Sequence, residues 1–479
     1  MNTAVWWIRR DLRLIDNQAL AAALSFCGVV YPVFILDPGL LQSSYVGDKR
    51  LAFLFAGLRR LDASLKERGS YLTVRRGKPA EALAQILQET GATAIFAEED
   101  YSPYARQRDS QVAETLPLRL TPGLTVYHPQ AIEKAEGGPY TVFTPYSRAW
   151  KKAGIPDLRD LLPVPDQIET PVGLSRIDLP ADPTLPQSVP FSAGEAEARQ
   201  RLEAFAGRWS GSPDSRPGEP YLIHRYGDQR NRMDLEGTSR LSPYLRFGMI
   251  SARQVAAVAF EAARTASGRA AASADTFLNE IIWREFYQSI LYHFPRVRRY
   301  SFREKYDALV WLNNRADFQA WCDGQTGYPV IDAAMRQLVS SGWMHNRARM
   351  IVASFLVKDL LIDWRWGERF FMQHLVDGDP AANNGGWQWT AGTGTDAAPY
   401  FRVFNPISQS EKFDPEGNYI RRWVPELAKV PTAFIHQPWT MPDSVQKKSG
   451  CQLGQDYPHP IVDHQMARQR ALDTFGEVK

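Results

Sequence analysis

The chain has 479 residues, 44% of them hydrophobic and 23% charged, and its formal net charge is +3. Its length favours two domains with a connection, and no apolar run approaches the roughly 18 residues of a membrane helix. The N-terminus lacks the pattern of a secretory signal. The cysteines Cys27, Cys322 and Cys451 are isolated, which excludes a disulfide framework and a zinc site and favours a reducing cytoplasm.

Residues 1–130 alternate buried strands with helices. We predict strands at 5–8, 29–36, 71–74 and 94–97, and helices at 50–65 and 79–90. This order predicts an α/β domain with a Rossmann-like, doubly wound parallel sheet. Such sheets bind ligands beyond the carboxyl ends of their strands. Polar side chains follow three predicted strands there, at 9–11, 37 and 98–100, although a G-x-G-x-x-G fingerprint is absent.

The stretch from about 121 to 220 is proline-rich and has no sustained period, so we predict an interdomain linker over residues 131–200. From 201 to 479 we predict one all-helical domain, with helices over 251–266, 273–293, 328–341, 347–361 and 365–376. Ten of the 14 tryptophans lie between Trp283 and Trp439. That concentration requires a large packed core or a function for the indoles.

The run Asp377–Trp389 places two acids, three amides, three glycines and two tryptophans in thirteen residues. Buried acids and amides need partners, and glycine lets backbone approach a flat ligand. The run therefore predicts one wall of a ligand pocket. An equally simple interpretation is a polar loop between helices whose Asp and Asn cap helix ends.

A second motif lies in the predicted helix over 273–293, where Glu280, Trp283, Arg284 and Tyr287 fall on one face. An aromatic face with an acid and a base suits a planar, hydrogen-bonding ligand such as a nucleobase. The same spacing also fits an ordinary Glu280–Arg284 ion pair beside core aromatics. Taken alone, this helix does not decide between the two.

Two further segments are ambiguous by themselves. In 342–350, Asn346, Arg347 and Arg349 are suited to contact phosphate, flavin or base edges, whereas His345 fits an ordinary helical histidine. In 238–245, hydroxyls before a helical run present N–H groups to a phosphate or simply cap the helix.

Basic clusters interleaved with aromatics are typical of nucleic-acid binding, although each one also fits a solvated basic face. They are Arg225, Arg230 and Arg232; Arg296, Arg298, Arg299, Arg303 and Lys305; and Lys412, Arg421 and Arg422. The chain has no H-E-x-x-H motif, no G-x-S-x-G motif and no P-loop, and we predict no metal site.

Taken in order, these segments resemble the photolyase/cryptochrome flavoprotein family over nearly the whole chain, beginning with Trp7-Ile8-Arg9-Arg10-Asp11-Leu12-Arg13. The similarity is strongest over 238–412 and most specific at 342–350 and 377–389. Within the family the chain looks most like the bacterial class I enzymes that repair cyclobutane pyrimidine dimers, the deoxyribodipyrimidine photo-lyases. The resemblance implies light-driven repair of ultraviolet-damaged DNA by electron transfer from excited reduced FAD to a flipped lesion.

The resemblance also implies residue roles. The FAD-binding residues would be Tyr226, Thr238, Ser239, Arg240, Leu241, Ser242, Arg349, Asp377, Asp379 and Asn383. Catalysis would involve Glu280, Asn346 and Asn383, with Trp387, Trp364 and Trp311 as an electron relay. Lesion and DNA contacts would come from Arg230, Glu280, Trp283, Arg284, Tyr287, Asn346, Arg347, Met350, Trp389 and Gln409.

Departures from the family pattern narrow this reading. Enzymes for the (6-4) lesion carry a histidine pair where this chain has Asn346 and Met350, which argues against that chemistry. Folate-binding members have Asn-Glu where this chain has Tyr104-Ala105, so we expect a deazaflavin or FMN antenna rather than methenyltetrahydrofolate. Pro380 stands where an aliphatic residue is expected.

The alternatives are a cryptochrome-type light receptor and a flavin-dependent redox enzyme unrelated to DNA. Asn383 argues against the receptor, since plant receptors have Asp there and animal ones Cys, and only about 40 residues follow the region of Trp439. The basic and aromatic clusters argue against the redox enzyme. We expect a cytoplasmic monomer that acts on damaged DNA and not at a membrane.

Overall fold

The computed structural model describes residues 3–207 and 221–478. Its contacts divide the chain into two compact units, each built from segments that are separate in the sequence. Unit 1 contains residues 1–227, 238–295 and 376–381, and unit 2 contains residues 228–237, 296–375 and 382–479. This division differs from the predicted domain boundaries at residues 130 and 200, because residues 238–295 and 376–381 cluster with the N-terminal part of the chain.

Unit 1 contains a parallel sheet of five strands in the order β3-β2-β1-β4-β5. The strands are β1 (Thr3–Ile8), β2 (Val29–Leu36), β3 (Thr73–Arg76), β4 (Ala94–Glu98) and β5 (Leu118–Thr121). The order reverses between β1 and β4, which confirms the predicted doubly wound sheet. The edge strand β5 was not predicted, because none of its residues is buried and it has no apolar run.

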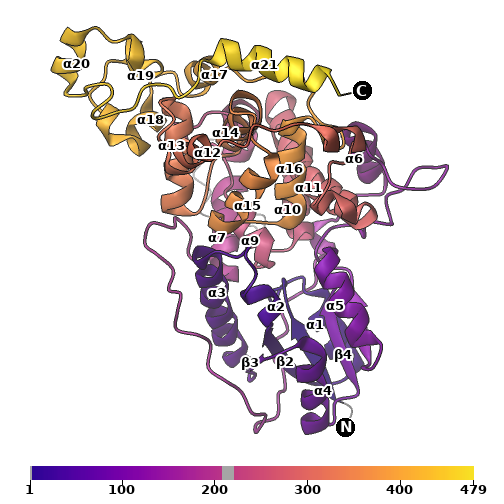
Figure 1. Ribbon diagram of the computed structural model, residues 1–479. Coiled ribbons are helices and arrows are strands. Elements are labelled where there is room, and N and C mark those ends of the chain that lie inside the picture. The colour runs from indigo at the N-terminus through magenta and orange to yellow at the C-terminus, as the bar shows by residue number, and fades with distance from the viewer. Residues whose placement is uncertain (1–2, 208–220, 479) are drawn as a thin grey trace. The chain divides into compact units, whose positions relative to one another are not determined.

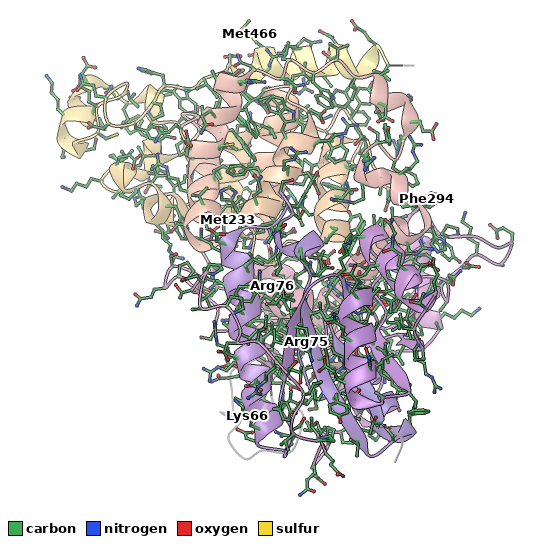
Figure 2. The ribbon with its side chains drawn as sticks, turned by 60° about the horizontal axis from the view of Figure 1, so that its bottom comes forward. Lys66, Arg75, Arg76, Met233, Phe294 and Met466 are labelled. Carbon is green, nitrogen blue, oxygen red and sulfur yellow. The ribbon has the colours of Figure 1, made fainter. Side chains whose placement is uncertain are left out.

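Helices cover both faces of the sheet (Figure 1): α1 (Gln18–Phe26), α3 (Asp48–Lys66), α4 (Pro79–Thr90) and α5 (Pro103–Ala113). The short helix α2 (Pro38–Leu41) follows the carboxyl end of β2. Ile86 of α4 and Val112 of α5 pack in one core cluster with Val5 of β1. On the opposite face Phe26 of α1 contacts Phe96, with ring centroids 5.6 Å apart. Figure 2 shows α3 ending at Lys66, at the other end of the sheet from Arg76, as a crossover between parallel strands requires.

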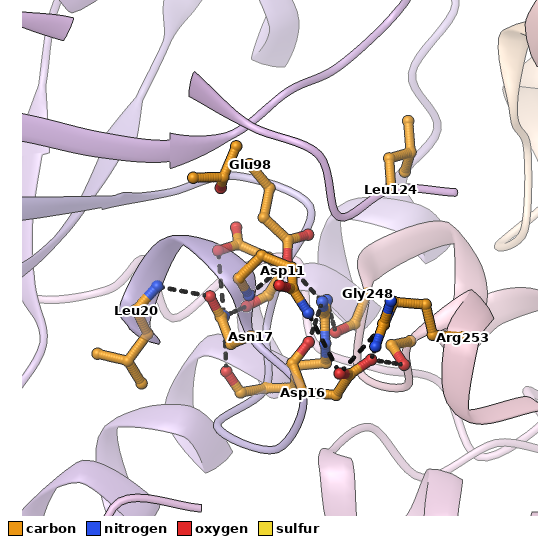
Figure 3. Close-up of polar contacts among 12 residues, drawn as sticks. Asp11, Asp16, Asn17, Leu20, Glu98, Leu124, Gly248 and Arg253 are labelled. Carbon is orange, nitrogen blue, oxygen red and sulfur yellow. Dashed lines mark hydrogen bonds and ion pairs between the residues drawn. The ribbon is translucent and has the colours of Figure 1, made fainter. Parts of the chain in front are cut away.

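The loop after β1 is fastened by polar contacts (Figure 3). Arg13 pairs with Glu98 at 2.5 Å. Asp16 accepts hydrogen bonds from Ser251 at 2.7 Å and from Arg253 at 3.3 Å. These contacts connect the carboxyl edge of the sheet with the start of a helix that begins at residue 252, so this loop is a rigid part of unit 1.

The remaining regular elements of unit 1 are helical: α6 (Phe143–Lys152), η1 (Leu158–Asp160), α7 (Glu195–Ala206), η2 (Leu222–Arg225), α8 (Tyr226–Gln229, which crosses into unit 2), α9 (Ser242–Phe247), α10 (Ala252–Thr265) and α11 (Gly268–His293). Residues 161–194, between η1 and α7, are irregular as predicted. Thus α6 and α7 interrupt the stretch predicted to be irregular. Tyr146 and Trp150 anchor α6 by burying their rings.

Unit 2 confirms the predicted helical character, and its helices surround one core that contains Trp321, Trp364 and Trp387. Its elements are η3 (Pro295–Arg298), η4 (Glu304–Ala308), α12 (Arg315–Asp323), α13 (Pro329–Ser341), α14 (Asn346–Ser354), η5 (Phe355–Asp359), α15 (Trp364–His374), α16 (Pro380–Ala391), α17 (Pro406–Phe413), α18 (Asn418–Trp423), η6 (Pro425–Leu427), α19 (Thr432–Ile435), η7 (Pro438–Thr440), α20 (Asp443–Ser449) and α21 (His464–Gly476). Across residues 3–207 and 221–478, no helix has the length and apolar character needed to cross a bilayer.

The run 377–389 is the main correction to the predicted secondary structure, because most of it is the helix α16 and not a loop. Pro380 occupies its first position, where a missing N–H costs nothing. Asp379 precedes it and accepts a hydrogen bond from the N–H of Ala381 at 2.9 Å, as an N-cap residue does. The unexpected proline is therefore a helix-start signal.

Candidate functional site

The predicted site residues fall on both units. Unit 1 holds Tyr226, Thr238, Ser239, Arg240, Leu241, Ser242, Glu280, Trp283, Arg284, Tyr287, Asp377 and Asp379. Unit 2 holds Arg230, Trp311, Asn346, Arg347, Arg349, Met350, Trp364, Asn383, Trp387, Trp389 and Gln409.

In unit 1 the aromatic face of α11 is extended by a residue that the sequence did not indicate. Phe143, the first residue of α6, stacks on Trp283 with ring centroids 3.7 Å apart and planes 5° apart. Tyr287 contacts the same indole at 5.5 Å, tilted by 34°. Both Trp283 and Glu280 are half-buried. Phe143 therefore fixes the plane of the indole from one side.

The side chains of Arg284 and Glu285 on α11 make hydrogen bonds within unit 1. Arg284 donates to the carbonyl oxygens of Leu124 at 2.9 Å and Leu245 at 3.5 Å. Glu285 accepts a hydrogen bond from the Trp150 indole at 2.7 Å, and burial raises its pKa to about 7. These bonds favour a structural role for Arg284 over the predicted DNA contact, since its guanidinium is committed to backbone carbonyls.

The segment 238–242 forms a strained turn before α9. Arg240 has φ +52°, in the left-handed region that non-glycine residues rarely adopt, and the N–H of Leu241 donates to Ser239 Oγ at 3.4 Å. Tyr226 is buried against Phe277 at 5.3 Å. Strain of this kind concentrates at ligand-binding sites, which supports the phosphate-binding alternative over a simple helix cap.

The segment 376–381, which leads into α16, is fixed by arginines of unit 1. Arg10 pairs with Asp379 at 2.6 Å. Arg246 and Arg50 donate to the carbonyl oxygen of Gly378 at 2.7 and 3.2 Å. A further hydrogen bond to Asp379 comes from Gln288 at 3.1 Å.

In unit 2 the two faces of α16 differ. Asn384 and Gln388 are buried, and both donate to the carbonyl oxygen of Val297 at 2.9 Å. The other face carries the small residues Ala382, Gly385 and Gly386, flanked by Asn383 and Trp389, all half-buried. A Cβ added at Gly386 would meet nothing within 4 Å. Asn383 donates to the carbonyl oxygen of Glu368 at 3.0 Å, so its amide is oriented at the edge of this open face.

The three candidate relay tryptophans share the core of unit 2. Trp387 is 3% exposed and Trp364 is 1% exposed, whereas Trp311 is half-buried and packs against Phe475 at 5.9 Å. Trp387 contacts Phe371 at 5.0 Å. Glycine at position 367 leaves room for this indole, because a Cβ there would lie 2.1 Å from the Trp387 ring.

The helix α14 carries four of the predicted residues of unit 2. His345 is its N-cap and accepts from the N–H of Arg347 at 3.1 Å, which agrees with an ordinary capping role. Arg347 is held by Asn231 at 2.7 Å and lies 4.5 Å from the Phe413 ring. Asn346 is exposed and Met350 is half-buried. Arg349 donates to the carbonyl oxygen of Met344 at 2.9 Å, and Gln409 lies on α17.

At the carboxyl edge of the sheet in unit 1, polar groups contact one another. The Tyr104 hydroxyl donates to Asp37 at 2.6 Å, and Arg9 pairs with Asp109 at 2.5 Å. Tyr104 packs closely on Gly39, since a Cβ there would lie 2.6 Å from its hydroxyl. Tyr104, which stands where folate-binding members of the family have asparagine, is therefore part of this polar edge.

Two sequence profiles match the chain, one described as DNA photolyase over residues 4–166 and one described as the FAD binding domain of DNA photolyase over residues 277–477. A deoxyribodipyrimidine photo-lyase of Synechococcus is 40% identical, over 99% of this chain and 96% of its own length. The chain belongs to the DNA photolyase family. This confirms the resemblance found in the sequence.

Solved structures of photolyases agree with this membership. A bacterial class III photolyase of Agrobacterium tumefaciens matches with a TM-score of 0.91 and 36% identity, covering 100% of this chain and 98% of that one. An archaeal photolyase of Sulfolobus tokodaii, solved with two FAD molecules, matches with a TM-score of 0.81 and 32% identity over 99% and 100% of the two chains. The class I assignment stays a prediction.

Proposed function

We propose that this chain is a deoxyribodipyrimidine photo-lyase, which uses light to split cyclobutane pyrimidine dimers in DNA with FAD as its resident cofactor. The observation that carries the proposal is the open face of α16. Small residues line it, and Asn383 and Trp389 flank it. A flat ring system would fit against such a surface, because glycine has no side chain and a Cβ at Gly386 would meet nothing within 4 Å.

The residues fit FAD in two further respects. The strained turn at Arg240 and the hydroxyls around it suit phosphate oxygens. The second is the carboxylate of Asp379, which suits the polar edge of a flavin or its ribityl chain. When bound, FAD supplies light absorption and a transferable electron. Tyr226, Thr238, Ser242, Arg349 and Asp377 complete the proposed binding set, along with Ser239 and Leu241.

For the lesion, we propose that Trp283 and Trp389 flank the extruded dimer, with Glu280, Asn346 and Met350 beside it and Tyr287 supporting Trp283. Extrusion costs roughly a few kcal/mol, less for a distorted pair, and stacking on aromatic rings offsets it. The stack with Phe143 supports this role, because an indole fixed in advance loses little freedom on binding. Glu280 would stabilise negative charge that develops on a dimer carbonyl.

Arg230, Arg347 and Gln409 are the proposed DNA contacts. Support for Arg347 comes from its hydrogen bond to Asn231, which holds a cation in a half-buried position. Arg284 has the least support as a DNA contact, because its guanidinium donates to the backbone carbonyl oxygens of Leu124 and Leu245. Trp387, Trp364 and Trp311 would relay electrons that restore the reduced cofactor. This role is supported by Trp387 and Trp364 sharing one hydrophobic core against which Trp311 packs.

A second chromophore at the carboxyl edge of the sheet in unit 1 is also part of the proposal. Its support is the archaeal relative with two FAD molecules together with Tyr104 at the position of the folate-type asparagine. We favour a deazaflavin or FMN over a folate. Cys27, Cys322 and Cys451 are buried free thiols, which fits the proposed cytoplasmic setting, and we expect a monomer.

The test is a light-dependent repair assay. Purified protein with reduced FAD should restore dimer-containing oligonucleotides under blue light and leave them unchanged in darkness. Glu280→Ala should lower the repair yield while FAD remains bound. FAD binding without repair in light would refute the enzyme and favour the cryptochrome alternative, whereas absence of any flavin would refute both.

A further inference from the structure

The loop after β1 carries an arginine whose backbone is locked in place. Gly248 has φ +62°, and a Cβ at that position would lie 1.8 Å from the carbonyl oxygen of Arg10. The N–H of Leu12 donates to the carbonyl oxygen of Phe247 at 3.1 Å. The end of α9 and the Arg10 backbone are therefore in direct contact, and only glycine fits between them.

The guanidinium of Arg10 is spread over three partners. It donates to the carbonyl oxygen of Arg246 at 3.1 Å, to Asp379 at 2.6 Å and more weakly to Asp100 at 3.4 Å. Its side chain is 12% exposed and that of Asp379 is 10% exposed. Burial disfavours the cation, yet Asp100 and Asp379 outweigh burial and raise the pKa of Arg10. The pair is thus a charged one in a mostly dry setting.

The Asp379 carboxylate has little freedom left. Its Oδ2 meets Arg10, and its Oδ1 accepts from Gln288 at 3.1 Å and from the N–H of Ala381 at 2.9 Å. Charge-assisted bonds of this kind are stronger than neutral ones and fix geometry. Because Asp379 also caps α16, the orientation of its carboxylate and the start of the helix that carries Asn383 are fixed together.

We infer that Arg10 is a positioning residue for the cofactor: it holds the Asp379 carboxylate in one orientation, so that the carboxyl edge of the sheet helps to organise the FAD site. The inference rests on the proposed function, in which Asp379 contacts the flavin. Arg10 itself touches no cofactor in this proposal. A residue of the N-terminal α/β segment thereby sets the affinity of FAD and the redox behaviour of its flavin.

A purely structural role is the competing explanation, since a buried ion pair broken on one side destabilises a fold in any case. The two explanations differ in what they predict for the folded, FAD-loaded protein: a purely structural role lowers the free energy of unfolding and leaves the flavin midpoint potential unchanged, whereas a positioning role shifts that potential. A double-mutant cycle then tests whether the shift passes through Asp379, because coupling between contacting residues appears only when both partners are present.

The experiment measures the FAD dissociation constant by equilibrium dialysis, and the flavin midpoint potential by titration, for Arg10→Gln, Asp379→Asn and the double variant. We expect Arg10→Gln to weaken FAD binding about 10- to 100-fold, by analogy with the loss seen when the hydrogen-bond partner of a metal ligand is removed. In the Asp379→Asn background the same change should have no further effect. Arg10→Lys should restore part of the affinity, because it keeps the charge without the planar fork.

Arg253→Gln is the matched control. Arg253 also joins the loop after β1 to a helix of unit 1, through Asp16, but does not contact the segment 376–381. It should leave the dissociation constant of FAD unchanged. If Arg10→Gln fails to fold, Arg10→Lys carries the same cycle.

Equal effects of Arg10→Gln in both backgrounds, or an unchanged FAD affinity and midpoint potential, would overturn the inference. Failure of the proposed function is distinguishable from this result, because the unsubstituted chain would then bind no FAD or repair no dimers. If the unsubstituted chain binds FAD and repairs dimers, an Arg10 variant with unchanged FAD affinity and midpoint potential refutes only the positioning role.

Discussion

Phe143 lies flat against Trp283, so its removal should weaken binding of damaged DNA although Phe143 itself is not proposed to touch the lesion. In Phe143→Ala the indole loses the neighbour that fixes its plane. Binding must then order that side chain again, at a cost of about 0.5–1.5 kcal/mol. With about 1.4 kcal/mol for each factor of ten, the dissociation constant for dimer-containing DNA should rise about 2- to 12-fold.

The assay is fluorescence anisotropy with matched oligonucleotides, with and without one dimer, in darkness. Affinity for undamaged DNA should stay the same, because it depends on phosphate contacts. In a Trp283→Ala background the Phe143 change should add nothing further. Phe143→Leu offers a less disruptive variant if alanine lowers the stability of α6. Equal losses of affinity for both oligonucleotides, or an additive effect in the Trp283→Ala background, would refute the reasoning.

Three other predictions concern the interior of the two units. In Trp150→Phe, Glu285 loses a hydrogen bond to its ionised form, worth about 1.5–3 kcal/mol. Burial already raises the folded pKa of Glu285 from 4.5 to about 7, so its contribution to stability is present at low pH and lost as the pH rises through about 7. Losing the indole N–H should raise the pKa of Glu285 further. Denaturant melts should therefore show that Trp150→Phe lowers the free energy of unfolding more at about pH 8.5 than at about pH 5. The same loss of stability at both pH values would contradict this prediction. Gly367→Ala places a Cβ against Trp387 and should lower stability by about 1–3 kcal/mol in the same melts, whereas an unchanged midpoint would mean that the indole moves freely. Trp387→Phe should slow photoreduction of oxidised flavin measured by flash absorption, and an unchanged rate would remove Trp387 from the relay.

Local sequence patterns correctly predicted the helices and strands whose secondary structure depends mainly on their own residues. The strands β1, β2 and β4 are buried runs of five or more residues, and α4 has Pro at its start and Gly91 at its end. Their prediction needed no knowledge of the rest of the chain. The edge strand β5 has neither burial nor an apolar run, so no local signal existed.

Long-range contacts explain what sequence reasoning missed. The amides and glycines of α16 indicate a loop, yet Asn384 and Gln388 are satisfied by the carbonyl of Val297, far away in the sequence, and the helix becomes possible. Phe143 and Arg10 gain their importance from Trp283 and Asp379, which lie 140 and 369 positions later. Such pairings become visible only once the chain is folded.

In the proposed function, this chain converts absorbed light into repair of pyrimidine dimers. The decisive assay counts the dimers restored per absorbed photon in an oligonucleotide that contains one dimer, with the FAD of the purified protein fully reduced. Repair should rise in proportion to the light dose and be absent in darkness. Reduced, flavin-loaded protein that binds the damaged oligonucleotide but restores none of it under light would show that the chain is not a photo-lyase.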